Sequence, residues 1–330
     1  MAETVAVLGA GSWGTALAIQ LARGDQQVRL WGHEPDHVER LSQLRENAEY
    51  LPGFSLADNI EPLTSLAEAV SRSPWLLIAI PSKGFRDLLR QLKPLIAMDT
   101  VLFWASKGFE IETGRLLHEV LEEELPGHRY GVISGPTFAT EVARGTPAAI
   151  ACAGSNLKAT EMFAEMLRGD HFRVYTTDDI VGVELGGALK NVLAIAVGAS
   201  DGLGFGANTR AALMTRGLSE IMQLGTRLGA RRETLMGLAG LGDIILTCTD
   251  DQSRNRRFGL AIGQGKSVSQ AEIEVGQTVE GLRAARAIYN KTRKLELDLP
   301  IIEAVYQVLY EGKDPRQAVR DLESRPQGRE

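Results

Sequence analysis

The chain is poor in the residues that build disulfide frameworks, metal centres and basic surfaces. Its 330 residues include two cysteines, Cys152 and Cys248, without metal-type spacing. This excludes a disulfide framework and indicates a reducing compartment such as the cytoplasm. The five histidines are scattered, and the net charge of -6 argues against nucleic acid as the main partner. We therefore expect a cytoplasmic protein with no metal ion and no nucleic-acid partner.

Targeting and membrane-spanning patterns are also absent. The N-terminal stretch MAETVAVLGAG has no basic region and enters a strand-like run directly, unlike a signal peptide. No apolar run reaches the ~18–20 residues of a membrane helix without a break or a charge. Hydrophobic residues make up 44% of the chain and charged residues 24%. This composition predicts a soluble protein, most readily of two domains, with no integral membrane association.

The first half of the chain alternates short apolar runs with stretches of helical periodicity. This alternation predicts a parallel sheet covered by helices on both faces. The runs expected to form strands are TVAVLG, QVRLWG, WLLIAIPS, DTVLFWASKG, RYGVISGP, PAAIACAG and FRVYTTDD. The helical stretches among them include SWGTALAIQLARG, GFRDLLRQLKPLI and TGRLLHEVLEEEL. Residues 1–180 are therefore expected to form a Rossmann-type, doubly wound α/β domain.

The pattern changes after about Ile180. Long segments with apolar spacing near 3.6 residues take over, and no convincing strand follows. These segments include IVGVELGGALKNVLAIAVGAS, TRAALMTRGLSEIMQLGTRLG, VEGLRAARAIYNKT and LPIIEAVYQVLYEG. Residues 181–330 are expected to form an all-helical domain with a polar C-terminal tail.

A glycine motif lies where the first strand is expected to meet the first helix. Gly9, Gly11 and Gly14 have the G-x-G-x-x-G spacing of dinucleotide-binding turns. In such turns the first glycine permits the tight bend, the second lets a pyrophosphate approach the backbone, and the third lets helix and strand pack closely. Free amides at the helix start then bind phosphate. A glycine turn without a ligand is the less favoured alternative in this context.

The end of the second expected strand bears on the choice of cofactor. NAD-preferring sites place an acid there, about 20 residues past the glycines. In this chain Gly32 and His33 stand at the expected place, and Glu34 follows one residue later. The absence of an acid at the strand end favours NADP(H). NAD(H) is also allowed, because Glu34 could bind a ribose 2′-hydroxyl.

One lysine stands in an almost wholly apolar stretch, VELGGALKNVLAIAVG. On a helix, Lys190 has Gly187 three residues and Gly186 four residues before it, so one side of the lysine has no neighbouring side chain. Two interpretations follow. The helix packs tightly through the glycines and the lysine extends to water, or the glycines leave clearance for a ligand that the lysine faces.

Further polar candidates follow expected strands or stand between expected helices. Lys83 and Lys107 each come after a strand, at the carboxyl edge where open α/β sheets bind ligands, and the position favours Lys107. Gly135 and Thr137 end another strand, where they form either a helix cap or a ligand contact. Asp243 lies between glycines. The run Ser253, Arg254, Asn255 is either a solvated face or a phosphate grip of hydroxyl, guanidinium and amide groups.

Six motifs in this order resemble the prokaryotic type of NAD(P)-dependent glycerol-3-phosphate dehydrogenase. They are GAGSWGTALA, ASKGFE, SGPTFATEVARGTP, GGALKNVLAIAVG, GLAGLGDIILTCT and SRNRRFG, and the resemblance runs from Val5 to about Gly312. It implies NAD(P)H-dependent, reversible reduction of dihydroxyacetone phosphate to sn-glycerol 3-phosphate for glycerophospholipid synthesis, by a homodimer. It also implies Lys190 as the general acid/base.

The resemblance assigns further residues to the two ligands. The substrate positions it implies are Lys107, Gly135, Thr137, Lys190, Asp243, Ser253, Arg254 and Asn255. The cofactor positions it implies, together with the glycine motif, are Ser12, Trp13, His33, Lys107, Ala139, Arg254, Glu280 and, through its backbone, Thr278. Relatives often carry arginine where this chain has His33, which weakens the expected preference for NADP(H).

The residue chemistry agrees with this reaction. A ketone that accepts hydride also needs a proton, and a lysine in a partly desolvated pocket can supply it. Two alternatives remain open at this stage. A β-hydroxyacid dehydrogenase also joins a dinucleotide domain to a helical one, but needs no phosphate grip. A non-catalytic dinucleotide sensor would have no use for the set Lys190, Asp243 and Arg254.

Overall fold

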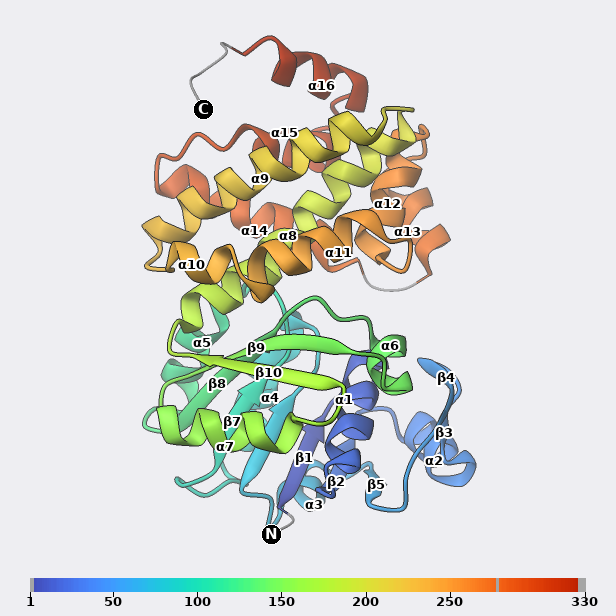
Figure 1. Cartoon of the computed structure of the whole chain (residues 1–330), viewed down its shortest axis with the longest axis vertical. Helices are drawn as coiled ribbons and strands as arrows, with labels where there is room; N and C mark the ends of the chain where they lie inside the picture. Colours follow the sequence, from blue (N-terminus) through green and yellow to red (C-terminus); the bar gives the residue numbers. More distant parts are fainter. Residues whose placement is uncertain (1–2, 277–278, 326–330) are drawn as a thin grey trace. The chain divides into compact units, whose positions relative to one another are not determined.

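The structure is a computed structural model that describes residues 3–276 and 279–325. The chain divides into two compact units, and Figure 1 colours the chain along its sequence. The first unit consists of Met1–Lys107 and Arg115–Glu184, and the second of Gly108–Gly114 and Leu185–Glu330. The second unit therefore begins four residues later than the boundary expected at residue 180, and it includes a short segment from the first half of the chain.

The first unit is built on an eight-stranded sheet. Its strands are β1 (Thr4–Leu8), β2 (Gln27–Trp31), β5 (Ile60–Leu63), β6 (Trp75–Ile78), β7 (Val101–Trp104), β8 (Arg129–Ser134), β9 (Ala148–Gly154) and β10 (Phe172–Thr177). They lie in the order β10-β9-β8-β7-β6-β1-β2-β5. The order reverses direction at β1, which pairs with both β2 and β6, as in doubly wound folds.

One pair of strands departs from the expected parallel arrangement. β8 and β9 are antiparallel, whereas the other neighbouring pairs of this sheet are parallel. After β8 the chain enters helix α6 (Ala139–Arg144). Arg23, at the end of helix α1 (Ser12–Arg23), donates a hydrogen bond of 2.8 Å to the carbonyl of Val142 in α6. The chain is thus held beside α1 and returns along β8 in the opposite direction.

Both faces of this sheet are covered by helices. The remaining helices of the first unit are α2 (Pro35–Leu44), α3 (Leu66–Val70), the 3₁₀ turn η1 (Ser82–Gly84), α4 (Phe85–Leu92), α5 (Leu117–Glu124) and α7 (Leu157–Leu167). Neighbouring residues of a strand point to opposite faces. Accordingly Phe103 stacks on Phe163 of α7, with ring centroids 3.9 Å apart, while Trp104 meets the edge of Phe85 of α4 at 5.8 Å. The expected α/β sandwich is confirmed.

A small hairpin adds to the first unit between α2 and β5. It pairs β3 (Glu46–Asn47) with β4 (Leu51–Ser55) in an antiparallel, two-stranded sheet separate from the main one. The sequence analysis did not predict it. Its buried residues are Asn47, 1% exposed, and Leu51, also 1% exposed, so a polar side chain anchors this hairpin alongside an apolar one.

The second unit is helical, and its described part contains no strand. Its helices are α8 (Ile180–Gly202, begun in the first unit), α9 (Ala207–Arg227), α10 (Arg232–Leu235), the π-helical turn η2 (Leu238–Gly242), α11 (Asp243–Thr249), α12 (Arg254–Gly263), α13 (Val268–Val275), α14 (Glu280–Lys294), α15 (Pro300–Tyr310) and α16 (Pro315–Glu323). The expected helical C-terminal half is confirmed, and Figure 1 shows these helices in colours from yellow-green for α8 to red for α16.

α8 and α12 approach closely enough to touch backbone to backbone. A Cβ atom built on Gly198 of α8 would lie 2.1 Å from the carbonyl oxygen of Arg256, and one on Gly259 of α12 would lie 2.2 Å from that of Ile195. Gly202 and Gly263 repeat the same relationship one turn further on. Only glycine fits at such contacts, so this glycine seam fixes the two helices against each other.

The length and composition of α8 would also suit a membrane span. Among the described residues it is the one helix that passes this test, and 83% of its most apolar window is buried inside the structure. It also carries Lys190 on its buried surface, with an exposed fraction of 7%. A helix that is apolar all round and surrounded by other helices is a core helix, and α8 has this role in the second unit.

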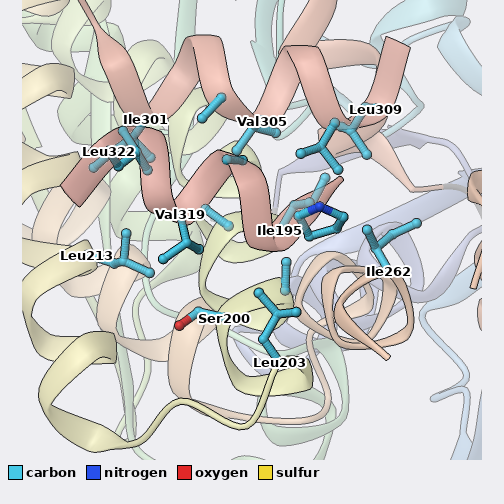
Figure 2. A pocket seen from close by; sticks show the side chains of 16 residues that line it. Ile195, Ser200, Leu203, Leu213, Ile262, Ile301, Val305, Leu309, Val319 and Leu322 are labelled. Atoms are coloured by element: carbon cyan, nitrogen blue, oxygen red, sulfur yellow. The ribbon is translucent and has the colours of Figure 1, made fainter. Parts of the chain in front are cut away.

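The helical unit contains a small, partly open apolar pocket. Its volume is about 60 Å³, and it is lined by residues from α8, α9, α12, α15 and α16. Figure 2 shows aliphatic side chains such as Leu213, Val305 and Leu322 around it, with the hydroxyl of Ser200 among them. That hydroxyl is buried, and its oxygen has no hydrogen-bond partner among the described residues.

Candidate functional site

Lys190 lies near the middle of α8, with its ammonium group in the interior. Its Nζ atom donates hydrogen bonds to Asp243 Oδ1 at 2.5 Å and to Thr247 Oγ1 at 2.9 Å. The lysine is 7% exposed and Asp243 is fully buried. The interpretation in which Lys190 extends to water is therefore wrong. A buried ammonium with a carboxylate and a hydroxyl as partners is satisfied in its charge and in its hydrogen bonds.

Thr247 completes this cluster, and sequence analysis missed it. Its hydroxyl accepts from Lys190 and donates to Asp243 Oδ1 at 3.2 Å. Asp243 and Thr247 stand four residues apart on α11, so they share one face of that helix. The four-residue spacing within GDIILTCT was the available signal, but it becomes visible only once this segment is known to be helical.

The two other polar residues of the stretch VELGGALKNVLAIAVG, Glu184 and Asn191, also have partners. Glu184 lies within the first unit, where its Oε2 is 2.5 Å from His118 Nδ1 and its Oε1 accepts from the backbone N–H of His118. Asn191, in the second unit, accepts a hydrogen bond of 2.9 Å from the side chain of Asn255. Burial raises the pKa of Glu184 despite its histidine partner. Each polar side chain in this stretch therefore has its own counterpart.

Gly186 serves the packing of α8 rather than a ligand. A Cβ atom at this position would lie 2.3 Å from the carbonyl oxygen of Ala239 in η2. Gly240 is equally constrained, since its Cβ would lie 1.9 Å from the carbonyl oxygen of Leu235. Of the two interpretations of the glycines, ligand clearance beside Gly186 is therefore wrong, because η2 fills that space, and tight packing is the one that holds there. This contact brings η2, and with it the start of α11 and Asp243, against the helix of Lys190.

The run Ser253, Arg254, Asn255 forms the start of α12. Ser253 is the N-cap, and its Oγ accepts from the backbone N–H of Arg256 at 3.2 Å. Arg254 is exposed, whereas Asn255 is buried. The amide of Asn255 donates to Asn191 beside the catalytic candidate, and its Oδ1 accepts from the backbone N–H of Gly281 at 2.9 Å. Ser253 and Asn255 thus fix the N-terminus of α12 by hydrogen bonds, and Arg254 presents an exposed guanidinium there.

Arg256 has a structural function in the same run. It is 8% exposed and forms an ion pair with Asp201 of α8 at 2.7 Å. Its Nε donates to the carbonyl of Cys248 at 3.1 Å. Arg254 and Arg256 are therefore distinguished by burial, with Arg256 fastening α12 to α8 and α11. Burial raises the pKa of Cys248 to about 12.

The glycine motif forms a turn between β1 and α1 with one open side. Gly9 has φ of +126°, and a Cβ there would lie 2.5 Å from the carbonyl oxygen of Ala79. A Cβ on Gly14 would lie 1.8 Å from the carbonyl oxygen of Gly9. At Gly11, in contrast, a Cβ would meet nothing within 4 Å. Two glycines thus close the turn and one keeps an approach to the backbone at the N-terminus of α1, which fits a dinucleotide pyrophosphate.

The remaining cofactor candidates of the first unit lie at carboxyl ends of strands or at helix starts. Ser12 and Trp13 open α1, and the hydroxyl of Ser12 donates to the backbone carbonyl of Tyr50 at 2.6 Å. His33 follows β2, with its Nε2 3.5 Å from Glu34 Oε1. Their side chains are 78% and 51% exposed. A histidine and an acid therefore stand side by side at the strand end that faces a ribose in this type of fold.

Substrate candidates of the first unit follow β7 and β8, which are neighbours in the sheet. Lys107 is half-buried three residues after β7. Gly135 follows β8 directly, and a Cβ there would lie 2.8 Å from Ile150 Cα. The Thr137 hydroxyl is 3.3 Å from the carbonyl oxygen of Gly135, and Ala139 begins α6. The fold brings these residues to one edge of the sheet.

The last candidates belong to the second unit. Glu280 is the first residue of α14, next to Gly281, which is bonded to Asn255. Thr278 lies outside the described residues. Within residues 3–276 and 279–325, no group of three or more histidine, cysteine, aspartate or glutamate side chains could hold a metal ion.

The first unit is a doubly wound sheet with a glycine turn that is open toward a phosphate. The same chain continues in helices that bury a lysine against an aspartate. This combination is typical of nicotinamide-dependent dehydrogenases. The chain belongs to that class of oxidoreductases. A sequence model described as the NAD-dependent glycerol-3-phosphate dehydrogenase N-terminus matches residues 4–160, and one described as the C-terminus of the same family matches residues 179–320.

Individual proteins agree with these matches. The glycerol-3-phosphate dehydrogenase [NAD(P)+] of Thioalkalivibrio sulfidiphilus is 52% identical over 325 residues, which cover 98% of this chain and 97% of that protein. Its counterpart in Shewanella halifaxensis is 51% identical over 326 residues, covering 98% and 96%. The crystal structure of glycerol-3-phosphate dehydrogenase from Coxiella burnetii has a TM-score of 0.96 at 45% identity and covers 98% of this chain and 99% of that one. The chain belongs to the NAD-dependent glycerol-3-phosphate dehydrogenase family.

Proposed function

We propose that the protein reduces dihydroxyacetone phosphate to sn-glycerol 3-phosphate, reversibly, with a nicotinamide dinucleotide as the source of hydride. The observation that carries this proposal is the buried contact of Lys190 with Asp243 and Thr247. A sensor or a structural protein has no need of a lysine buried at this cost. A dehydrogenase needs one group that can give a proton to a carbonyl oxygen and take it back.

Lys190 is the general acid/base in this proposal. In the reducing direction the ketone carbon accepts hydride, and the carbonyl oxygen takes a proton from Nζ. In the oxidising direction the neutral amine takes the proton from the hydroxyl. The cofactor, when bound, supplies the hydride or accepts it. A positioned acid/base group typically contributes ~10²–10⁴-fold to rate.

Asp243 and Thr247 set the position of the lysine. Their oxygen atoms hold Nζ from the α11 side, so the ammonium does not have to find its place when substrate binds. The hydrogen bond between Thr247 and Asp243 fixes both acceptors. Such preorganisation reduces the reorganisation that the reaction itself requires.

The substrate phosphate is bound by the start of α12. Arg254 is exposed there, at the N-terminus of a ten-residue helix whose backbone amides favour an anion. Asn255 keeps one amide N–H for the substrate after its bond to Asn191. Ser253, Lys107, Gly135 and Thr137 are proposed as the further substrate contacts. Binding energy from the phosphate would orient the ketone for hydride transfer.

The dinucleotide is bound by the turn of Gly9, Gly11 and Gly14. Its further proposed contacts are Ser12, Trp13, His33, Lys107, Ala139, Thr278, Glu280 and Arg254. His33 favours NADP(H), because an imidazole can donate a hydrogen bond to a 2′-phosphate, whereas a carboxylate would repel it. NAD(H) remains a substrate through Glu34, which lies beside His33 and can accept from a ribose 2′-hydroxyl.

The resemblance to prokaryotic glycerol-3-phosphate dehydrogenases also supports a proposal for the compartment, the oligomeric state and the use of the product. We propose a cytoplasmic homodimer whose product enters glycerophospholipid synthesis. Both cysteines are buried and unpaired, in keeping with a reducing compartment. Light scattering coupled to size exclusion tests the oligomeric state.

The activity is tested by following the oxidation of NADPH and of NADH, through the absorbance of the reduced nicotinamide, with dihydroxyacetone phosphate as substrate. We expect turnover with both cofactors and none with dihydroxyacetone, which lacks the phosphate. Folded protein without turnover with either cofactor would overturn the proposal. Equal turnover with the unphosphorylated ketone would overturn the phosphate grip.

A further inference from the structure

The side chain of Asn47 is bonded to the turn that is proposed to bind the pyrophosphate. Its Nδ2 donates to the backbone carbonyl of Ala10 at 2.8 Å and to the hydroxyl of Thr15 at 2.7 Å. Ala10 stands between the first two glycines of the motif, and Thr15 lies in the first turns of α1. Asn47 itself belongs to the β3–β4 hairpin, outside the main sheet.

The other end of the amide is equally engaged. Oδ1 accepts from the backbone N–H of Tyr50 at 3.2 Å and lies 3.0 Å from Nε2 of His37. An asparagine amide has two donors and one oxygen with two lone pairs, so these four contacts use its full capacity. The residue is 1% exposed. A buried, fully bonded amide has one orientation and holds its partners in place.

The bond to Ala10 has a consequence for Gly11. The peptide between them is trans and planar. In such a unit the C=O and N–H groups point in opposite directions. A carbonyl of Ala10 directed at Asn47 therefore directs the N–H of Gly11 away from it. Gly11 is also the glycine at which an added Cβ would meet nothing within 4 Å, so the turn is open to a ligand at this residue.

A second bond ties the same hairpin to the same helix start. The hydroxyl of Ser12 donates to the backbone carbonyl of Tyr50 at 2.6 Å. The hairpin and the glycine turn are thus joined by side chains from both partners, Asn47 from one and Ser12 from the other. Neither bond is part of the backbone hydrogen bonding of the main sheet or of α1.

We propose that Asn47 is a positioning residue for the cofactor, which aims the Gly11 amide at the pyrophosphate of the dinucleotide. The proposal rests on the dinucleotide site of the preceding section. Asn47 is expected to raise affinity for the cofactor without taking part in proton or hydride transfer. Its removal leaves the turn intact but lets the Ala10–Gly11 peptide rotate.

The test compares Asn47→Ala and Asn47→Asp with wild type. Asp keeps the shape but replaces the donor with an oxygen that repels the carbonyl of Ala10. We expect the Kd of NADPH, measured by fluorescence titration, to rise about 10- to 100-fold in both variants. The Kd of ADP-ribose, which contains the pyrophosphate, should rise in parallel. At saturating NADPH, kcat should stay within about threefold of wild type, because Asn47 takes no part in proton or hydride transfer and the lost affinity is offset by saturation.

Asn59→Ala is the matched control. The side chain of Asn59 donates to the carbonyl groups of Ala22 and Gln26, both at 2.9 Å, at the opposite end of α1. The substitution therefore removes two side-chain hydrogen bonds to backbone carbonyl groups at and just beyond the C-terminal end of α1, far from the glycine turn. Its Kd for NADPH should equal that of wild type.

Two results would overturn the proposal. One is an unchanged Kd in folded Asn47→Asp, and the other is an equal rise in Asn59→Ala, which would show a loss of general stability only. If Asn47→Ala does not fold, Asn47→Asp and Asn47→Ser decide in the same assay. Wild type that does not bind NADPH would instead refute the dinucleotide site itself, so the two failures are distinguishable.

Discussion

Lys190 and Asp243 stand 53 positions apart in the chain, and their side chains meet at 2.5 Å in the interior of the helical unit. The contact exists because Gly186 lets η2 lie directly against α8, so that Asp243 begins α11 beside the lysine. An ion pair of this kind, with the carboxylate fully buried, is costly unless each partner is hydrogen-bonded. Thr247 supplies the additional hydrogen bonds.

Thr247→Val should lower kcat by about tenfold or more, because it removes a hydrogen bond to a charged group. The KM for the cofactor should not change. Thr249→Val is the control on the same helix. Thr249 is exposed, and its hydroxyl donates to the backbone carbonyl of Ile245 in the preceding turn. Steady-state kinetics check this, and equal effects of the two substitutions would contradict a positioning function for Thr247.

The pair His33 and Glu34 should govern the choice between NADPH and NADH. Glu34→Gln removes a negative charge near the proposed 2′-phosphate, so kcat/KM for NADPH should rise about two- to fivefold relative to that for NADH, the range expected for exposed charges. His33→Ala should shift the ratio in the opposite direction. Glu39→Gln, an exposed change on α2, should leave it unaltered. A ratio that is the same in all three variants would refute the assignment.

Ser200→Ala should stabilise the protein. The hydroxyl of Ser200 is buried, and no described residue bonds to it, so its removal relieves a desolvation cost of about 1 kcal/mol or more. Ser73→Ala is a matched contrast, because the equally buried hydroxyl of Ser73 donates to the carbonyl of Ala69 at 3.0 Å. Urea denaturation should show a higher midpoint for the first variant and a lower one for the second. A drop in both would mean that Ser200 has a partner.

Glu220 should make stability fall as pH rises from about 4.5 to 7. Its carboxylate accepts from the backbone N–H groups of Ile301 and Ile302 at the start of α15. Burial nevertheless raises its pKa from 4.5 to about 7. Between these two values the folded state binds more protons than the unfolded state, and the free energy of unfolding decreases with pH.

Glu220→Gln removes this titration. Relative to wild type, the variant should gain about 1–3 kcal/mol in free energy of unfolding between pH 5 and pH 8. Glu311→Gln, at the exposed end of α15, serves as the control and should follow wild type. Parallel curves for wild type and Glu220→Gln would show that the carboxyl group of Glu220 is charged throughout this range.

Much of the fold could be predicted because its signals are local. β-branched runs such as TVAVLG and glycine stops such as Gly24 mark the strands and helices of the first unit directly. The hairpin of β3 and β4 was missed because one strand has two residues and the other contains Pro52 and Gly53. The antiparallel course of β9 was missed because strand direction depends on where α6 docks, which no local pattern shows.

The site was predictable where chemistry and motif coincide. A lysine in an apolar helix is conspicuous in any sequence, and so is an aspartate between glycines. Thr247 and Asn191 were not conspicuous, because threonine and asparagine are common and their importance comes from contacts across 57 and 64 positions. The sequence could not decide between packing and ligand clearance at the glycines beside Lys190 for a related reason, since the backbone that fills the space at Gly186 comes from Ala239.

The central claim is that Lys190 exchanges the proton with the substrate. The measurement that tests it most directly is kcat of Lys190→Met with dihydroxyacetone phosphate at saturating NADPH, alongside the Kd of NADPH for the same protein. We predict that kcat falls by ~10²–10⁴-fold while the Kd stays that of wild type. A folded variant that retains kcat within about threefold of wild type, well short of that range, would contradict the assignment of Lys190 as the general acid/base.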